Sequence, residues 1–238
     1  MRAWADALRE GFREIGIDLS AEQVARCSRF REAILEWNGI AGLTAIVEGE
    51  EMAIKHFVDS GLCLHAVVPE SGWGICDVGS GAGFPGVVLG ILQPSARVTL
   101  IEASRKKAEF LKVALAAGGV EGRVLCCRGE DAARELDLRE AFDLVVARAV
   151  APMRVLAEYC LPLVRVGGWF VALKGPEAGE EVGEASRAVA VMGGCCEELI
   201  ARDLPFGYGR RTLVKVRKVA MTPERYPRRA GMAEKRPL

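Results

Sequence analysis

The stretch ICDVGSGAGFPG, from Ile75 to Gly86, decides how the rest of this chain is interpreted. A short apolar segment runs into Asp77, and glycines then follow at alternate positions, Gly79, Gly81 and Gly83. An apolar segment over 84–92 comes next, so the order predicts a strand, a glycine turn and a helix. Glycines in such a turn let the backbone approach a ligand closely. The D-x-G-x-G-x-G spacing differs from the G-x-G-x-x-G of dinucleotide-binding proteins, and glycines required only by turn geometry would look the same.

Length and composition allow one sizeable domain with an extension. The chain has 238 residues, of which 50% are hydrophobic, and no apolar run approaches the length of a membrane span. Its N-terminus does not have the pattern of a signal peptide. Eight cysteines without a C-x-x-C motif, together with only two histidines, give a metal site little to use. We therefore predict no metal, no membrane segment, and buried, reduced thiols in a cytoplasmic protein.

The charge is zero overall but unevenly distributed. Between Arg210 and Leu238 there are ten basic residues and two acidic ones, an excess of eight positive charges that the rest of the chain balances. A basic end on an acidic body suggests a polyanionic partner. A solvated tail that serves solubility alone would give the same count.

The first seventy residues have a helical pattern. Ser20 and Gln23 resemble a capping box, and apolar residues recur at helical spacing from Cys27 to Trp37. We expect this helix to break at Asn38, Gly39 and Gly42, and a second helical stretch to run from about 51 to 67. The predicted organisation is a helical cap over 1–70, a main domain over 71–219 and a basic tail over 220–238.

Strand and helix patterns alternate after the glycine turn. Strands are expected near 98–101, 122–127, 142–147, 169–173, 198–204 and 212–219, and helices near 106–117, 153–163 and 177–192. Alternation of this kind predicts an α/β fold, with a doubly wound, mostly parallel sheet that becomes antiparallel only at its last edge. With the strand before the glycine turn, the sheet has seven strands.

Each predicted strand ends in a polar or glycine-rich cluster. The clusters are Asp77–Gly83, Glu102, Arg128–Glu130, Arg148 and Lys174. In parallel sheets ligands bind beyond these ends, where the strand order reverses. Glu102 has the place of an acid that accepts both hydroxyls of a ribose. No phosphate-binding G-x-x-x-x-G-K-[ST] motif is present, so a nucleoside without phosphates, S-adenosylmethionine, fits best.

The methyl acceptor is indicated by what is missing. The segment ARAVAP over 147–152 has no Asn/Asp-Pro-Pro-aromatic loop for methylating exocyclic amines, and no cysteine is expected at a strand end. A ring nitrogen such as guanine N7 needs only in-line positioning, without base or covalent intermediate. Arg148 and Lys174 would then hold the substrate, although a salt bridge at the sheet edge is the alternative, evenly matched for Lys174. His56 and Asp59 are interpreted as fixing the cap rather than as a catalytic pair.

Several motifs in order resemble the bacterial 16S rRNA guanine-N7 methyltransferases, also called glucose-inhibited division protein B. They are WN at 37–38, LTAI at 43–46, KHFVDS at 55–60, DVGSGAGFPG at 77–86, RKKAEFL at 105–111, RGE at 128–130, ARA at 147–149, LKG at 173–175 and the tail from Tyr226 to Leu238. The resemblance spans nearly the whole chain. It implies a Rossmann-like class I methyltransferase that acts on one guanine of the small ribosomal subunit.

The resemblance also implies roles for individual residues. The substrate or catalytic residues would be Lys106, Arg128, Arg148 and Lys174. The S-adenosylmethionine-binding residues would be Asp77, Gly79, Gly81, Gly83, Phe84, Glu102, Gly129, Glu130 and Arg148. Three positions depart from the family pattern. Gly42 replaces an asparagine and removes an amide near the mouth of the site, Glu102 replaces an aspartate and has a longer reach, and Ala233 replaces a proline, which leaves the tail less constrained.

Two other functions stay open from the sequence. The same crevice could serve a small-molecule methyltransferase, against which the basic tail argues. The other open function is a non-catalytic rRNA-binding module with a relic cofactor pocket. The intact glycines and Glu102 argue against this function. Nothing in the sequence requires more than a monomer, with 16S rRNA or the small subunit as partner.

Overall fold

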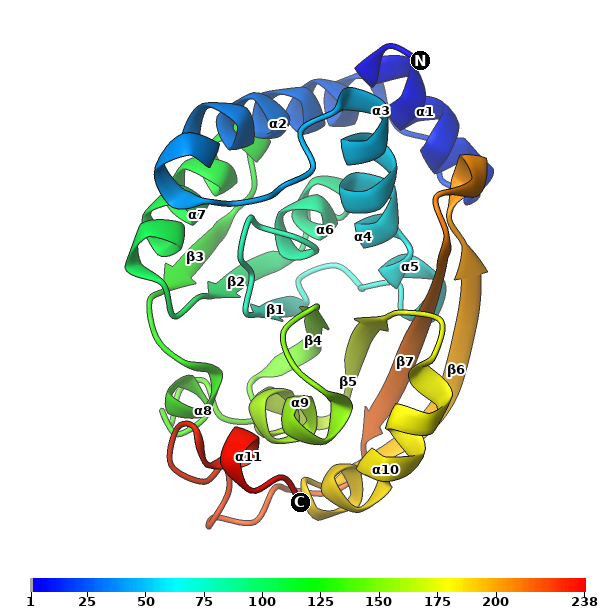
Figure 1. The fold of residues 1–238 in the computed structure, drawn as a ribbon. Coiled ribbons are helices and arrows are strands. Elements are labelled where there is room, and N and C mark those ends of the chain that lie inside the picture. The colour runs from blue at the N-terminus through cyan, green and yellow to red at the C-terminus, as the bar shows by residue number, and fades with distance from the viewer. Residues whose placement is uncertain (1) are drawn as a thin grey trace.

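A computed structural model describes residues 2–238, which form a seven-stranded sheet with helices on both faces (Figure 1). The strands are β1 (Gly74–Val78), β2 (Arg97–Ile101), β3 (Gly122–Leu125), β4 (Phe142–Arg148), β5 (Val164–Lys174), β6 (Gly194–Asp203) and β7 (Arg210–Lys218). Their spatial order is β3-β2-β1-β4-β5-β7-β6. The order reverses between β1 and β4, where ligands bind in such sheets.

The pairing confirms the predicted sheet. β1 to β5 are parallel to their neighbours, and β7 pairs antiparallel with both β5 and β6. Residues 144–147 of β4 and 170–172 of β5 are fully buried, because helices cover both faces of the sheet. This burial on two sides explains why these strands are continuously apolar in sequence. β6 and β7 form a hairpin, which needs only a short connection and therefore runs antiparallel.

The helices divide between the two faces of the sheet. One face is covered by α1 (Trp4–Glu14), α2 (Ala21–Ala41), α3 (Gly49–Met52), a π-helical segment (Ala53–Val58), α4 (Asp59–Gly61), α5 (Cys63–Ala66), α6 (Gly86–Leu92) and α7 (Arg105–Gly118). The other is covered by α8 (Gly129–Ala132), α9 (Met153–Cys160), α10 (Ala178–Val191) and α11 (Met232–Lys235). Short 3₁₀ turns lie at Leu161–Leu163 and Pro205–Gly207.

Helix α2 begins where the sequence predicts and ends later. Ser20 Oγ accepts from Gln23 N (3.1 Å) and Ser20 N donates to Gln23 Oε1 (2.9 Å), so the capping box is confirmed. The predicted break at Asn38 and Gly39 is wrong, because one glycine costs a long helix only about 1 kcal/mol. The helix ends at Gly42, whose φ of +59° is left-handed, a conformation that glycine and asparagine adopt most readily.

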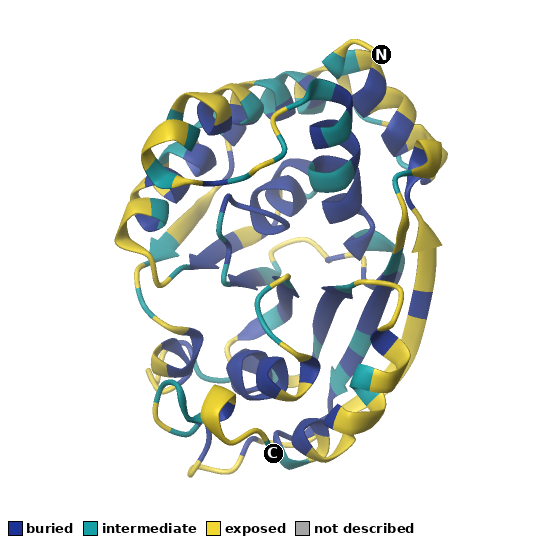
Figure 2. Cartoon of the chain, viewed as in Figure 1, coloured by how far each residue is buried: buried dark blue, intermediate teal, exposed yellow. Residues whose placement is uncertain are grey.

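The cap and the sheet share one apolar core. Phe30 of α2, Phe57 of the π-helical segment and Phe84 of the glycine turn pack with ring centroids 5.1–5.5 Å apart. Figure 2 shows the buried residues continuing from the cap helices through the sheet. The cap helices and the sheet thus share buried contacts, and the division of the chain at residue 70 stays a prediction.

The C-terminal segment packs against α8 and α9 rather than extending into solvent (Figure 1). Arg228 Nη2 donates to Glu158 Oε2 (2.7 Å), and this carboxylate is 1% exposed. Arg139 Nη1 donates to Tyr226 O (2.8 Å), while buried Lys218 Nζ donates to Leu161 O (2.7 Å). Two of the basic residues counted from the sequence, Lys218 and Arg228, are thus structural, which reduces the charge left for a polyanion.

The cysteines are only partly buried. Four are buried, namely Cys27, Cys63, Cys76 and Cys160. Three are exposed, namely Cys126, Cys195 and Cys196, and Cys127 is half-buried. The expectation of buried thiols is therefore wrong for the two adjacent pairs, because β6 is an edge strand and the segment after β3 faces a cavity.

Candidate active site

A cavity of about 440 Å³ lies at the carboxyl ends of β1 to β4. Its wall includes the glycine turn after β1, Glu102 after β2, residues 127–130 after β3 and residues 148–150 after β4. Cap residues and the C-terminal segment complete it. The volume falls in the range of small-molecule sites. The convergence of strand ends predicted from the sequence is therefore confirmed for these four strands.

The glycine turn leaves room for the cavity. Gly79 has φ +74°, and a Cβ there would lie 2.6 Å from Val150 Cγ2. Gly79, Gly81 and Phe84 line the cavity. A larger residue at Gly79 would both strain the backbone and displace the segment after β4.

Asp77 and Gly83 belong to the same motif but do not line the cavity. Asp77 is fully buried, and its Oδ2 accepts from Gly86 N (2.9 Å) at the start of α6. Burial raises the pKa of Asp77 to about 7. A Cβ at Gly83 would lie 2.9 Å from Val87 and 3.0 Å from Phe30, so this position faces the core. Both residues shape the turn from outside the cavity lining, and their predicted cofactor contact stays a prediction.

Glu102 is held in place by the backbone. Its Oε2 accepts from Gly81 N (2.9 Å) and its Oε1 accepts from Ser104 N (2.7 Å). A carboxylate can accept about four hydrogen bonds, so both oxygens keep capacity for hydroxyl donors. Glu102 lines the cavity, as expected of a ribose-binding acid.

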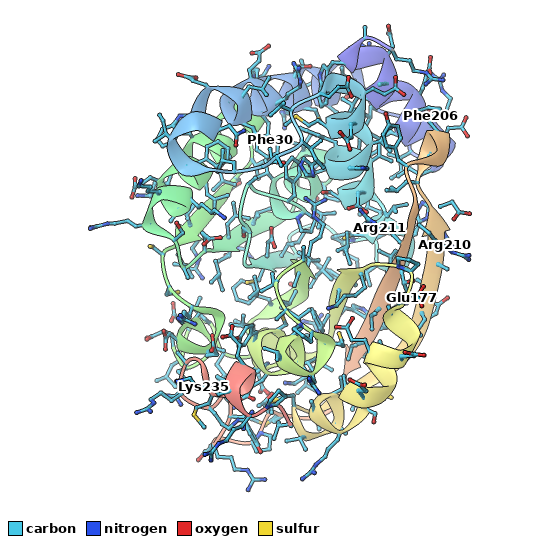
Figure 3. The ribbon with its side chains drawn as sticks, viewed as in Figure 1. Phe30, Glu177, Phe206, Arg210, Arg211 and Lys235 are labelled. Atoms are coloured by element: carbon cyan, nitrogen blue, oxygen red, sulfur yellow. The ribbon has the colours of Figure 1, made fainter. Side chains whose placement is uncertain are left out.

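Arg148 and His56 line one side of the cavity and are held by Asp59 and Arg211, which do not line it; we call these four residues the basic wall. Arg148 Nη1 donates to Asp59 Oδ2 (3.0 Å), and Arg211 Nε donates to Asp59 Oδ1 (2.9 Å). Asp59 is 1% exposed. Because it pairs with Arg148 of β4 and Arg211 of β7, it joins the cap to both strands. Figure 3 labels Arg211 on β7, beside the cap. Arg148 and His56 face the cavity.

His56 is a lining residue that the sequence interpretation did not commit to the site. Its Nε2 lies 2.8 Å from Thr44 Oγ1, its Nδ1 lies 3.4 Å from Arg148 Nη2, and its ring stacks on Phe84. Burial and the Arg148 charge lower the pKa of His56 to about 4. The ring is therefore neutral at physiological pH and has both nitrogens engaged, in keeping with its predicted role in fixing the cap.

The opposite side, which we call the acidic wall, consists of Glu130, Tyr159 and Glu234. Glu130 Oε1 accepts from Gly231 N (2.9 Å), and Tyr159 Oη donates to Glu234 Oε1 (3.0 Å). All three line the cavity beside Gly129. Burial and the two carboxylates raise the pKa of Tyr159, so its hydroxyl stays protonated. Sequence reasoning found Glu130 but not Tyr159 or Glu234.

The predicted basic residues are placed differently from one another. Arg128 is exposed and lines the cavity. At the start of α7, Lys107 lines the cavity, whereas Lys106 is exposed and does not line it. Lys174 Nζ donates to Ala151 O (2.7 Å) and Glu181 Oε1 (2.6 Å), in a neighbouring hollow. The salt-bridge alternative for Lys174 is thus observed, and it anchors the segment that packs on Gly79.

Cys127 corrects the expectation that no cysteine lies at a strand end. It follows β3 and lines the cavity. Burial and the nearby Asp131 raise the pKa of its thiol. Because the thiolate is the reactive form, this cysteine lacks the activation of a nucleophile.

None of the described helices is long and apolar enough to span a membrane. No three His, Cys, Asp or Glu side chains of residues 2–238 come together as a metal site.

Proteins of similar sequence identify the family of this chain. The family model described as rRNA small subunit methyltransferase G, GidB, matches residues 23–201. The chain belongs to this family. It is 48% identical to ribosomal RNA small subunit methyltransferase G of Pelotomaculum thermopropionicum, over 100% of both chains. It is 45% identical to the protein of that name from Symbiobacterium thermophilum, over 99% of this chain and 98% of the other. The resemblance, the methyltransferase class and S-adenosylmethionine as methyl donor, all expected from the sequence, are confirmed.

Solved structures support the fold. A predicted O-methyltransferase from Agrobacterium tumefaciens superposes with a TM-score of 0.53 at 22% identity, covering 69% of this chain and 82% of that one. The ribosomal protein L11 methylase of Lactobacillus delbrueckii subsp. bulgaricus gives 0.52 at 15% identity, covering 70% and 79%. The Rossmann-like methyltransferase fold of this family member is thereby confirmed.

Proposed function

We propose that this methyltransferase transfers the methyl group of S-adenosylmethionine to N7 of one guanine in 16S rRNA of the small ribosomal subunit. The observation that carries the proposal is the single cavity in which Glu102 and the glycine turn lie between the acidic wall and the basic wall. We further propose that the protein acts as a monomer in the cytoplasm.

The cavity residues fit the methyl donor. Gly79 and Gly81 present backbone without Cβ atoms, and Glu102 offers acceptor capacity for ribose hydroxyls. The acidic wall would repel phosphates, in keeping with a nucleoside that has none. When bound, S-adenosylmethionine supplies an electrophilic methyl group on a sulfonium.

His56, Cys127 and Asp59 are poorly suited to act as a general base. Both nitrogens of His56 are engaged, the thiol of Cys127 is unactivated, and the carboxylate of Asp59 is buried and paired with two arginines. Guanine N7 already carries an in-plane lone pair and loses no proton when it attacks. The chain's contribution is then to position the base, which can supply several kcal/mol, about 7 or more in well-oriented reactions.

Arg148 is proposed to hold the substrate through the guanidinium edge that Asp59 leaves free. Arg128 and Lys107 at the exposed rim are proposed to contact RNA phosphates, since such contacts fix register without reading sequence. Lys174 is proposed to act indirectly, through the segment that includes Ala151 and Val150.

The deciding experiment is transfer from labelled S-adenosylmethionine to small subunits that lack N7-methylguanine, with the product located by cleavage at the modified base. Label at one guanine is the expected result, and label at an exocyclic amine or a free metabolite would overturn the proposal.

Lys107→Ala should raise the KM for RNA about tenfold, whereas Lys106→Ala, its matched neighbour, should raise it less than about twofold. Equal effects would remove Lys107 from the interface.

A further inference from the structure

Residues 149–152, which connect β4 to α9, separate the active-site cavity from a neighbouring hollow. Ala149 and Val150 line both spaces. Side chains in a protein core are fixed by neighbours on every side. Because this segment has open space on two sides, packing alone fixes it poorly, and its position depends on polar anchors.

The backbone of this segment has an unfavourable conformation at its first residue. Ala149 has φ +55°, in the left-handed region that residues with a Cβ rarely adopt. Such a residue persists only where the surrounding structure imposes the conformation. Val150, the next residue, packs on Gly79 of the glycine turn. The segment therefore requires a contact from elsewhere in the chain that keeps Ala149 left-handed and Val150 on the turn.

Glu181 of α10 supplies this contact with a single oxygen. Its Oε1 accepts from Lys174 Nζ (2.6 Å) and from Met153 N, the first N–H of α9. Lys174 Nζ also donates to Ala151 O (2.7 Å), so both hydrogen bonds of Glu181 lead to the segment. We call these two hydrogen bonds the Glu181 clamp. Figure 1 shows α9 and α10 on the same face of the sheet.

The start of α9 explains why an acceptor from another element is needed. The residue before the helix is Pro152, whose side chain has no hydrogen-bonding atom. Met153 is fully buried, so its N–H has no bulk water to satisfy it. A carboxylate near a helix N-terminus is also favoured by the helix dipole. Glu181 thus acts as the cap that Pro152 does not provide.

We propose that Glu181 is a positioning residue for methyl transfer. It fixes Lys174 and the first turn of α9, and through them it holds residues 149–152 against the glycine turn. This keeps the cavity in the shape in which the acceptor base meets the methyl group in line. The proposal rests on the proposed function of the same cavity.

A positioning role separates the two kinetic constants. Misplacing a reacting group by about 1 Å can reduce the rate of the chemical step about 100-fold. The RNA itself is proposed to be held by phosphate contacts at Arg128 and Lys107, which lie outside the segment. Loss of the Glu181 clamp should therefore lower kcat and leave the KM for RNA nearly unchanged.

The test measures kcat and KM for methyl transfer to small subunits that lack N7-methylguanine. Glu181→Met removes the acceptor and keeps the side-chain length, so it should lower kcat about 30-fold and change KM less than about twofold. Glu181→Gln keeps an oxygen that accepts from Met153 N, so its kcat should stay within about threefold of the unmodified protein. Glu184→Met is the matched control on α10, because Glu184 pairs with Arg154 at 3.9 Å and is exposed. It should change neither constant. The proposal is overturned if Glu181→Met behaves like Glu184→Met, or if Glu181→Gln loses as much kcat as Glu181→Met.

A double variant tests whether Glu181 and Lys174 act through the same segment. Glu181→Met combined with Lys174→Met should have a kcat no more than about twofold below that of the weaker single variant, since both changes release one structure. A loss equal to the product of the two single losses would mean that Lys174 contributes independently, and it would overturn the clamp.

Hydrogen exchange of the Met153 amide is a readout that does not depend on activity. Glu181→Met should speed this exchange about tenfold or more through local opening, whereas Glu184→Met should leave it unchanged. Unchanged exchange in Glu181→Met overturns the clamp and leaves the proposed function intact. Absence of methyl transfer by the unmodified protein overturns the proposed function, a failure that the exchange measurement does not share.

Discussion

The two walls of the cavity are built on opposite principles. In the basic wall every charged group has a partner, because Asp59 holds Arg148 and Arg211 with one buried carboxylate. In the acidic wall buried Glu130 accepts from Gly231 N, whereas Glu234 accepts from Tyr159 Oη and is exposed. Buried paired charges fix one another's geometry, whereas an exposed carboxylate stays free to turn toward water. The comparison therefore contrasts a side fixed by a buried ion-pair network with a side that is partly open to solvent.

The walls also come from different parts of the chain. The basic wall joins the cap to β4 and β7, and the acidic wall joins α8 and α9 to the C-terminal segment. Both ends of the sequence thus complete a site whose centre is the glycine turn.

The largest effect is expected from Asp59→Asn. Losing this carboxylate leaves Arg148 and Arg211 facing each other without a counter-charge, so the free energy of unfolding should fall by about 3 kcal/mol, measured in urea. Asp203→Asn is the matched control, because Asp203 pairs with the neighbouring Arg210 at 3.8 Å and is 83% exposed. That change should cost less than about 0.5 kcal/mol. Equal losses in the two variants would refute the central role of Asp59.

A smaller effect is expected from Glu158→Gln, which weakens the anchor of the acidic wall. The carboxylate is buried but Arg228 can turn toward water, so unfolding should become easier by about 2 kcal/mol. Amide exchange over residues 228–236 should rise well beyond that global change. Glu184→Gln serves as control, since its pair with Arg154 is exposed and 3.9 Å long. Normal exchange in Glu158→Gln would mean that the segment docks without this pair.

The sequence could predict the sheet and the centre of the site because both depend on local patterns. Strand periodicity and the glycine spacing identified Gly79, Gly81 and Glu102, all of which line the cavity. Asp77 belongs to the same pattern, yet it lies in the core and accepts a hydrogen bond from Gly86 N at the start of α6. The pattern fixes where the chain turns, and does not tell which side chains of the turn face outward.

The outer parts of the site depend on packing between distant segments, which no local pattern encodes. Lys106 and Lys107 are adjacent in a basic run, and only the rotation of α7 decides that Lys107 faces the cavity. Glu234 looked like one of two acids in a basic tail, and its place follows from the docking of that tail on Tyr159. The Lys-His at 55–56 next to Asp59 was a usable signal for the basic wall, because adjacent polar residues in an apolar helix require partners.

The smallest effect concerns the protonation of His56, which sharpens the contrast between the walls. Its pKa of about 4 lies below the ordinary value of 6.5, so the folded state binds its proton less well than the unfolded state. The corresponding stability is complete above pH 6.5 and is lost as the pH falls toward 4, by about 1 kcal/mol once partial exposure is allowed for. NMR titration of the ring should give a midpoint near 4 in the unmodified protein and a higher one, by about 1 unit, in Arg148→Met. Arg154→Met, a change at an arginine outside both walls, should leave the midpoint where it was. A midpoint that does not move in Arg148→Met would show that burial alone holds the ring neutral, and that the basic wall acts on His56 only through its shape.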